Sequence, residues 1–460
     1  LIINNNDAYK ISGYTDHRGV VVSSFNHNEV IKIKDIFIKD NIKDIAIVTK
    51  FSTRNNETEL KIKSMLENNF DNITLGHLMS GNLNFPRRIN TAYLNASVKD
   101  IFISFAENTI KSFKQLNIDI PINILKADGG VMDLSDAKDL PVQTIMSGPA
   151  ASLMGTLGLT NINTDAIILD IGGTTTDIFF LADGIPLFEP TGINIKEYKT
   201  LVRSIYSKSI GLGGDSLVKL VNNKIEIGPV RLDKAAALGG KYPTPTDALI
   251  VLNKTNLGNV DLSNKAISKL ANEINLSIKE TAKLIVDTFI KTIKDEVDIL
   301  LKIINSKPVY TIKEILENKE LDPKSIAVIG ASANAFSSFL EKSFNLEVLI
   351  PKNYEVANAI GSALAITTKE INLLINTFLK TYVVPELGIN KKINKNYNLK
   401  EAEEEALKLL DEHLTLRSND SNLELEVLES NSFSMVDGFY TKGENIRVKV
   451  QVKPGLTRKM

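Results

Sequence analysis

The chain has 460 residues, of which 43% are hydrophobic and 24% charged, so we expect a globular protein of roughly two or three domains with sizeable cores. Its 54 basic and 55 acidic residues leave a net charge of −1, which argues against nucleic acid or an anionic membrane as the main partner. The absence of cysteine excludes disulfides, thiolate metal sites and a cysteine nucleophile. Because no apolar stretch is long enough to span a bilayer and the first residues do not form a signal peptide, we expect a cytoplasmic location.

The first part of the chain alternates strand and helix signals. Strands are expected at residues 20–22, 45–48 and 73–75, with a helix at 57–69. This β-α-β pattern favours a mixed or parallel sheet with helices on its faces. A long helix is predicted from Phe85 to about Leu116, and the residues expected on its buried side are Ile89, Ala92, Ala96, Phe102, Phe105 and Phe113.

The next strand, at residues 122–125, is followed by an acid and two glycines. Asp128 stands just beyond this strand, where α/β sheets place ligands, although a simple turn would explain the same residues. Residues 147–149 then begin a helix that is expected to end at Gly158.

Residues 166–181 form the central stretch of the chain. Two short apolar runs enclose the sequence Asp-Ile-Gly-Gly-Thr-Thr-Thr-Asp at residues 170–177, which predicts two buried strands joined by a tight turn. Gly172 and Gly173 can take positive φ and have no Cβ, so backbone N–H groups could close on an anion. Further hydroxyl donors come from Thr174, Thr175 and Thr176.

An acid stands at each end of this turn. Asp170 could hold a hydrated Mg²⁺, and Asp177 could hold a second water or brace the turn. An ordinary hairpin is the alternative interpretation, but the three threonines and the flanking acids favour nucleotide phosphate.

Two weaker candidates follow. Gly211, Gly213 and Gly214 precede a helical pattern and are a second candidate loop for phosphate or substrate. Asp247 lies near the start of a predicted helix; it is a candidate metal ligand, with a helix cap as the alternative.

The capping-box spacing of Ser277 and Glu280 predicts a helix that reaches about Ile304. A strand at 324–329 then runs into small residues and a helix, an arrangement that allows a flat group such as adenine to approach the backbone. The candidate residues there are Gly330, Ala331 and Asn334, although close strand–helix packing would explain them as well. Another strand at 346–350 and a helix at 354–367 follow.

Beyond residue 369 the pattern changes. An acidic amphipathic helix is expected at 398–414, and residues 423–452 predict three short strands with turns at 437–438 and 442–443. We therefore predict three segments: a first lobe at 1–160, a second lobe at 161–369 and a C-terminal α+β module at 370–460.

The hairpin resembles the phosphate-binding hairpin of the actin, hexokinase and sugar-kinase superfamily. More closely, the chain from about residue 11 to 365 resembles the A-type subunit of the hydantoinase/oxoprolinase family, and it is also similar to ketone carboxylase β-type subunits. The segments that carry this resemblance, in the family's order, are 51–55, 126–132, 147–151, 170–177, 211–214 and 245–248.

The resemblance implies an α/β, two-lobed actin-like ATPase (ribonuclease H-like) fold. The implied chemistry is ATP- and Mg²⁺-dependent phosphorylation of an amide, imide or ketone oxygen, with charge on the transferred phosphoryl group stabilised by Mg²⁺ and N–H donors. By this resemblance Asp170 and Asp177 would handle Mg²⁺ and water, and residues 172–176 would grip the phosphates. Residues 330–334 would approach the adenosine, while Asp128 and Gly213–Gly214 would lie near the substrate.

The sequence departs from the family at two places. Members normally begin with another Asp-x-Gly-Gly-Thr hairpin, and none precedes residue 166, so we expect the N-terminal part of the first lobe to be missing, supplied by another chain, or lost in a degenerate ATPase. The loop at 330–334 is also poorer in glycine than the family's usual adenosine loop.

These observations leave three readings of the function. The leading one is an ATP-dependent hydrolase subunit that acts on a cyclic amide or imide of the hydantoin or 5-oxoproline type, together with a B-type partner subunit. The alternatives are a ketone carboxylase β-type subunit and a non-catalytic regulatory protein that retains the fold. The substrate and a homo-oligomeric state stay open.

Overall fold

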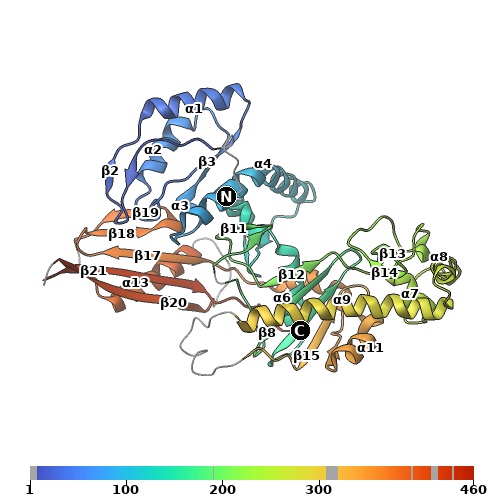
Figure 1. Ribbon diagram of the computed structural model, residues 1–460. Coiled ribbons are helices and arrows are strands. Elements are labelled where there is room, and N and C mark those ends of the chain that lie inside the picture. The colour runs from blue at the N-terminus through green and yellow to red at the C-terminus, as the bar shows by residue number, and fades with distance from the viewer. Residues whose placement is uncertain are drawn as a thin grey trace. The chain divides into compact units, whose positions relative to one another are not determined.

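The computed structural model describes residues 8–189, 191–306, 320–394, 397–415, 423–437 and 440–459. They fold into two compact units (Figure 1). The first unit is built from described residues within 1–147, 189–204 and 365–455, and the second from those within 148–188, 205–364 and 456–460. Each unit is thus assembled from separate stretches of chain. The three segments predicted from the sequence concern functional domains, and that division stays a prediction.

The first unit opens with the predicted β-α-β pattern. A short antiparallel pair, β1 (Tyr14–Thr15) and β2 (Val21–Ser23), precedes helix α1 (His27–Lys39). Strand β3 (Asp44–Ile47), helix α2 (Glu57–Leu66) and strand β4 (Asn72–Leu75) follow, and the two strands pair in parallel. Their core is formed by Val30, Ile45, Ile47, Ile62, Leu66 and Leu75.

The long helix α4 (Phe85–Gln115) follows the short helix α3 (Gly76–Met79) and has the predicted bounds. The Asn84 side chain accepts a hydrogen bond from the Arg87 N–H, and a proline stands in the first turn, as helix starts favour. Ala92 and Ala96 are buried as predicted, but Phe105 is 51% exposed. The short strands β3 and β4 contact α4 without covering its whole length, so the prediction for Phe105 was wrong.

The strand before Asp128 belongs to a hairpin. Strand β5 (Asn123–Leu125) pairs antiparallel with β6 (Val131–Asp133), so residues 126–130 form the turn between them. Helix α5 (Leu134–Ala137) and the 3₁₀ turn η1 (Pro141–Thr144) come next. A second small hairpin, β10 (Asn194–Ile195) with β11 (Tyr198–Lys199), lies in the stretch 189–204.

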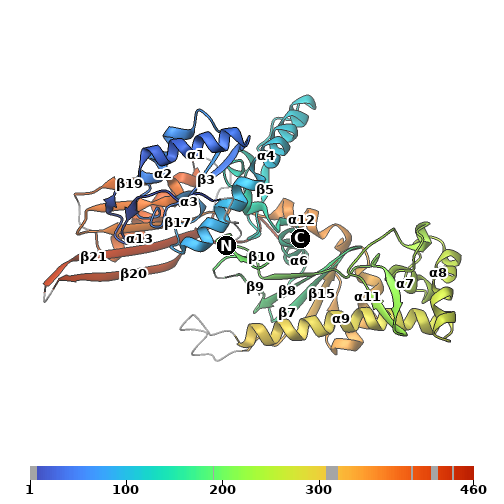
Figure 2. The same ribbon diagram turned by 45° about the horizontal axis from the view of Figure 1, so that its top comes forward.

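The C-terminal part of the first unit is a five-stranded antiparallel sheet of order β19-β18-β17-β21-β20 (Figure 2). Helix α13 (Leu399–Thr415) packs its apolar residues, among them Ala402, Ala406 and Leu410, on one face of this sheet. The strands are β17 (Glu370–Asn376), β18 (Thr381–Val384), β19 (Ile389–Lys392), β20 (Leu425–Asp437) and β21 (Tyr440–Val452), with the 3₁₀ turn η4 (Pro385–Leu387) between β18 and β19.

The prediction of three short strands after residue 423 was therefore wrong. The two strands β20 and β21 are 13 residues each, and the turn expected at 442–443 lies inside β21. At the register shift between Met435 and Val436, Lys442 is the extra residue of a bulge and Gly443 stays in register with Met435, so the pairing continues. The turn expected at 437–438 lies partly outside the described residues.

The second unit is centred on a sheet of order β12-β8-β7-β15-β16, with β9 (Ile185–Pro186) paired to β8. Strands β7 (Ala166–Ile171), β15 (Ser325–Ile329) and β16 (Glu347–Leu349) are parallel, whereas β8 (Thr176–Ala182) and β12 (Ser207–Ile210) run antiparallel to their neighbours. In its core, Ile167 and Leu169 pack against helices α9 (Ile278–Ser306) and α11 (Ala333–Phe344). The rings of Phe289 on α9 and Phe336 on α11 stack with their centroids 4.5 Å apart. Helix α9 begins at the predicted capping box.

Further helices complete this unit: α6 (Ser147–Leu159), α7 (Pro245–Val251), α8 (Val260–Glu273) and α12 (Ala357–Leu364), with the 3₁₀ turns η2 (Ala236–Leu238) and η3 (Tyr354–Val356). The prediction of a helix directly after the glycine loop was wrong, because this part of the chain forms a hairpin of β13 (Val218–Val221) and β14 (Lys224–Ile227). Asn222 and Asn223 both take positive φ, as the commonest two-residue hairpin turn requires. In the described parts of the chain, no helix has the length and apolarity needed to cross a membrane.

Asp247 is fully buried, and its carboxylate links three elements of the second unit by hydrogen bonds. Its carboxylate accepts hydrogen bonds from the backbone N–H groups of Ala236, Ala237 and Thr244 at 3.0, 2.8 and 3.0 Å. It also accepts from the hydroxyls of Thr244 and Ser263 at 2.8 and 2.7 Å. These five bonds connect η2, α7 and α8, so the structure favours the helix-cap interpretation, and we leave Asp247 out of the metal site proposed below.

We predict that Asp247→Asn lowers the stability of the chain by roughly 3 kcal/mol, because an amide nitrogen cannot accept and leaves buried donors without partners. The measurement is urea unfolding followed by circular dichroism. The matched control is Asp261→Asn on the exposed first turn of α8, for which a change below about 0.5 kcal/mol is expected. Equal unfolding midpoints for Asp247→Asn and the wild type would contradict this role.

Candidate functional site

The β7–β8 hairpin presents its turn with free backbone donors. The Gly172 N–H donates to the Thr175 carbonyl at 3.0 Å, which closes the turn. The N–H groups of Gly173, Thr174 and Thr175 donate to no other residue in the described part of the chain. Three neighbouring N–H groups without partners can bind the oxygens of an anion such as phosphate.

The second glycine loop packs directly on this turn. The N–H groups of Gly214 and Asp215 donate to the carbonyls of Gly172 and Gly173 at 2.9 and 2.7 Å. A Cβ on Gly213 would lie 2.5 Å from the backbone nitrogen of Thr174, closer than real side chains approach. Only glycine therefore allows this backbone contact at position 213.

The third candidate loop begins beside Asp170. In the parallel pairing of β15 with β7, Ile329 lies opposite Asp170, and Gly330 follows with φ of +97°. A Cβ on Gly330 would lie 2.7 Å from Asp170 Oδ1. Ala331 and Asn334 are exposed at the start of α11. The second unit thus brings together the predicted residues of the hairpin, the 211–214 loop and the 330–334 loop.

The two acids of the hairpin lie opposite each other in the β7–β8 register. Burial raises the pKa of Asp170, although Ser152 donates to its Oδ2 at 2.5 Å. Burial also raises the pKa of Asp177, the charge of Asp170 adds to the rise, and a hydrogen bond from Ser209 opposes it. Asp177 Oδ1 is buried and has no hydrogen-bond partner in the described structure.

These two carboxylates fit a hydrated magnesium ion. No group of three or more acidic or histidine side chains gathers at metal-binding distance within the described residues. Mg²⁺ is usually held by one or two carboxylates with waters and substrate phosphates, so a larger protein cage is not required. One oxygen of Asp177 has no hydrogen-bond partner among the described residues, and the pKa of both acids is raised. The ionised carboxylates are therefore poorly stabilised by the protein, and a bound cation would stabilise them.

Three further residues at this site were missed by the sequence analysis. Ser152 is one, and its position in a helix gave no signal. The others are Asp215 and Arg231, which form an ion pair at 2.9 Å, with Asp215 Oδ2 3.1 Å from the place a Cβ on Gly173 would take. The position of Asp215 directly after the Gly-Gly pair was the one signal available for it.

Asp128 belongs to the first unit and is held by several partners. The Gly130 N–H donates to its carboxylate at 3.0 Å, the Thr368 hydroxyl at 3.2 Å and Lys126 Nζ at 3.2 Å. Burial alone would raise the pKa of Asp128, but the charges of Lys126 and Arg203 and these hydrogen bonds hold it below its usual value. A Cβ on Gly130 would lie 1.9 Å from Thr368 Oγ1, so the glycine makes this contact possible. The carboxylate therefore fastens the 126–130 turn to the strand-like segment before β17.

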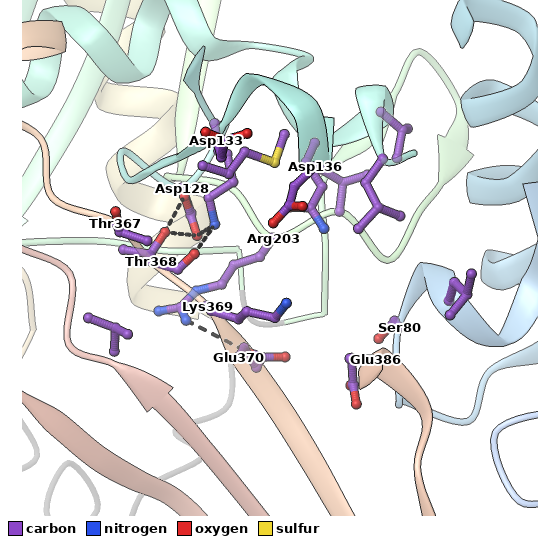
Figure 3. Close-up of a pocket in the computed structure, with 18 of the residues that line it drawn as sticks. Ser80, Asp128, Asp133, Asp136, Arg203, Thr367, Thr368, Lys369, Glu370 and Glu386 are labelled. Atoms are coloured by element: carbon purple, nitrogen blue, oxygen red, sulfur yellow. Dashed lines mark hydrogen bonds and ion pairs between the residues drawn. The ribbon is translucent and has the colours of Figure 1, made fainter. Parts of the chain in front are cut away.

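Asp128 also lines a cavity of about 400 Å³ within the first unit (Figure 3). Charged groups from separate stretches of the sequence meet there. Arg203 Nη1 lies 3.5 Å from Glu370 Oε2, and Lys369 Nζ lies 2.6 Å from His413 Nε2. The half-buried amide of Gln143 also lines the cavity, and it makes no side-chain hydrogen bond with another described residue.

Two solved structures share this fold. An acetone carboxylase in its nucleotide-free form matches with a TM-score of 0.69 and 15% identity, over 98% of this chain and 70% of that one. An ATP-dependent caprolactamase from Pseudomonas jessenii matches with a TM-score of 0.68 and 18% identity, over the same shares of the two chains. The predicted α/β fold of the actin-like ATPase type is thereby confirmed.

Sequence comparison identifies relatives as well. An uncharacterized protein of Methanocaldococcus jannaschii is 24% identical over 396 residues, which are 79% of this chain and 56% of that protein. The chain thus spans little more than half the length of this curated relative. Residues 88–371, more than half of the chain, match the hydantoinase/oxoprolinase family, and the six ordered motifs point the same way. The chain therefore belongs to the hydantoinase/oxoprolinase family.

Proposed function

We propose that this chain is a subunit of an ATP-dependent hydrolase that activates a cyclic amide or imide, of the hydantoin or 5-oxoproline type, by phosphorylating its carbonyl oxygen. The observation that carries the proposal is the turn of residues 172–176. Its N–H groups at 173–175 have no partner among the described residues, and two carboxylates of raised pKa stand at its ends. Membership of the family and the shared fold with an ATP-dependent caprolactamase support it.

The proposed roles follow from the positions of the residues. The N–H groups of 173–175 would bind phosphate oxygens, and the threonine hydroxyls would add donors. Asp170 and Asp177 would hold Mg²⁺, which neutralises charge on the transferred phosphoryl group. Gly330 to Asn334, together with the glycines at 211, 213 and 214, would surround the rest of the nucleotide.

We further propose that the cavity of the first unit receives the small-molecule substrate. Its volume of about 400 Å³ suits a small cyclic compound. The Gln143 side chain offers N–H donors and a carbonyl acceptor, the complement of the carbonyl and N–H of a cyclic amide. Asp128, held charged by Lys126, would position this wall of the cavity rather than transfer a proton.

A ketone carboxylase β-type role is the second candidate, favoured by the fold shared with acetone carboxylase. In both roles a separate subunit, of B type in the hydrolases, would be the partner, and the cytoplasm would supply the ATP. A regulatory protein without turnover would keep the fold but would not hydrolyse ATP in response to any substrate, so the experiments below separate it from the two enzymes.

We predict that Mg²⁺-ATP binds to the chain and that Asp170→Ala weakens binding at least about tenfold, a loss of roughly 1.4 kcal/mol. Isothermal titration calorimetry measures both affinities. Asp183→Asn, on the exposed turn after β8, is the matched control and should bind as the wild type does. The proposed nucleotide site would be refuted if Mg²⁺-ATP bound neither to this chain nor to any other natural form of the protein that contains the hairpin.

We predict that Asp177→Asn raises the unfolding midpoint of the nucleotide-free protein near neutral pH. A raised pKa in the folded state means that the charged carboxylate is destabilising there, and that the wild type regains this stability as the pH falls through the raised pKa. The advantage of the variant should therefore shrink on acidification. Asp128→Asn, whose pKa is lowered, should show the opposite sign at neutral pH.

These two variants are compared with the wild type by thermal unfolding across a pH series in EDTA. A midpoint that falls in Asp177→Asn and rises in Asp128→Asn would show that the charge balance assigned to the two sites is wrong.

We predict that Gln143→Leu abolishes substrate-stimulated ATP hydrolysis while Mg²⁺-ATP affinity is unchanged, since the substitution keeps the volume and removes the amide. The assay compares phosphate release with 5-oxoproline, hydantoin, caprolactam and acetone, with the partner subunit present. Stimulation by a cyclic amide supports the hydrolase, and stimulation by acetone with bicarbonate supports the carboxylase. Full stimulation in the variant would exclude Gln143 from substrate binding.

A further inference from the structure

Arg54 lies in the loop that follows β3, in the first unit. The parallel strands β3 and β4 end beside this loop, and ligands of α/β proteins commonly bind at the carboxyl ends of such strands. The half-buried guanidinium of Arg54 donates from Nη1 to Asn445 Oδ1 on β21 at 3.5 Å. The loop is thereby joined to the C-terminal sheet.

Arg447 stands two residues beyond Asn445 on the same strand. Side chains alternate along a strand, so Asn445 and Arg447 share one face, while Ile446 and Val448 are buried on the other face in the core that includes α13. The two guanidiniums therefore lie on the same side of the sheet, both next to Asn445. Within the described residues neither of them forms an ion pair with an acidic side chain.

Two neighbouring cations, Lys449 and Arg203, are paired with an acid. Lys449, the next outward residue of β21, lies 3.0 Å from Glu370 Oε1, and Arg203 lies 3.5 Å from Glu370 Oε2. This contrast distinguishes Arg54 and Arg447, because these two half-buried guanidiniums have no acidic partner among the described residues.

Two buried polar atoms of the same loop also have no hydrogen-bond partner among the described residues. Thr53 is fully buried, and its hydroxyl, like the Nε–H of Arg54, makes no hydrogen bond in the described structure. Buried polar groups in proteins almost always have a partner. Burial, together with the charge of Arg447, which acts in the same direction, lowers the pKa of Arg54 to about 10. Both effects would be relieved by a bound anion.

We propose that Arg54 and Arg447, with the hydroxyl of Thr53, form a binding site for the phosphate group of a small ligand. Guanidinium groups bind phosphate oxygens through paired N–H donors. A phosphate monoester carries a charge of about −1.5 to −2 near neutral pH, which balances two arginines. The site lies in the first unit, whereas the nucleotide hairpin belongs to the second, so it does not rest on the proposed function.

The test is thermal unfolding with inorganic phosphate against sodium chloride at equal ionic strength, near neutral pH and in EDTA. Phosphate is expected to raise the unfolding midpoint of the wild type by roughly 2–4 °C more than chloride does. Arg447→Gln should raise the midpoint without phosphate, because it removes the repulsion on Arg54, and should abolish the part of the phosphate effect that this site supplies.

Lys449→Gln is the matched control on the same face of β21. Because it breaks the pair with Glu370, it should lower the midpoint and keep the full phosphate effect. Arg447→Lys, which keeps the charge, should retain a reduced phosphate effect and serves if the glutamine variant does not fold. The proposal is overturned if phosphate acts no differently from chloride on the wild type. It is also overturned if both Arg447 variants respond to phosphate as fully as the wild type, which would place that response at another site such as the hairpin.

Discussion

The candidate nucleotide site depends on one close contact between backbones. The turn after β7 and the loop after β12 approach so closely that a Cβ at position 213 would overlap the backbone of Thr174. This contact lets Gly172 and Gly173 use their carbonyls to hold the second loop, while the N–H groups of residues 173–175 have no hydrogen-bond partner among the described residues. Any side chain at position 213 would separate the loops and with them the donors, so the geometry of the site rests on the smallest residue available.

Three aspartates show how partners decide the behaviour of the same side chain. Asp128 is buried with a lysine, an arginine and hydrogen-bond donors, and its pKa is lowered. Asp170 and Asp177 are half-buried opposite each other with few donors, and their pKa values are raised. The first arrangement stabilises the fold, and the second stores unfavourable charge that a cation would relieve. This difference separates a structural acid from a candidate metal ligand, although Asp128 and Asp170 both lie near the carboxyl end of a strand and within two residues of a glycine.

The family match and the shared fold both extend over most of the chain. The family match covers residues 88–371, which include the hairpin, both further loops and Asp128. The fold is shared with acetone carboxylase and with an ATP-dependent caprolactamase over nearly the whole chain, at identities of 15% and 18%. At such identities the likeness concerns the fold, so the choice between a cyclic amide and a ketone has to come from the cavity walls and from experiment.

Local signals determined much of what the sequence could predict. The glycines and acids of the central turn, the capping box of α9 and the start of α4 each act within a few residues of chain, so their pattern is visible without the fold. The β-α-β order of the first unit and the two apolar strands around the hairpin were predicted for the same reason.

Tertiary structure decided everything that depends on residues distant in sequence. Asp247 caps a helix and binds Ser263, Asp128 contacts Thr368, and Phe105 is 51% exposed on α4. The pairing of β20 with β21 absorbed a turn signal into a bulge, and Arg54 met Asn445 across 391 residues of chain. Which side chains meet, and whether a buried charge finds a partner, depends on packing between distant segments, and a single sequence does not contain that information in any local pattern.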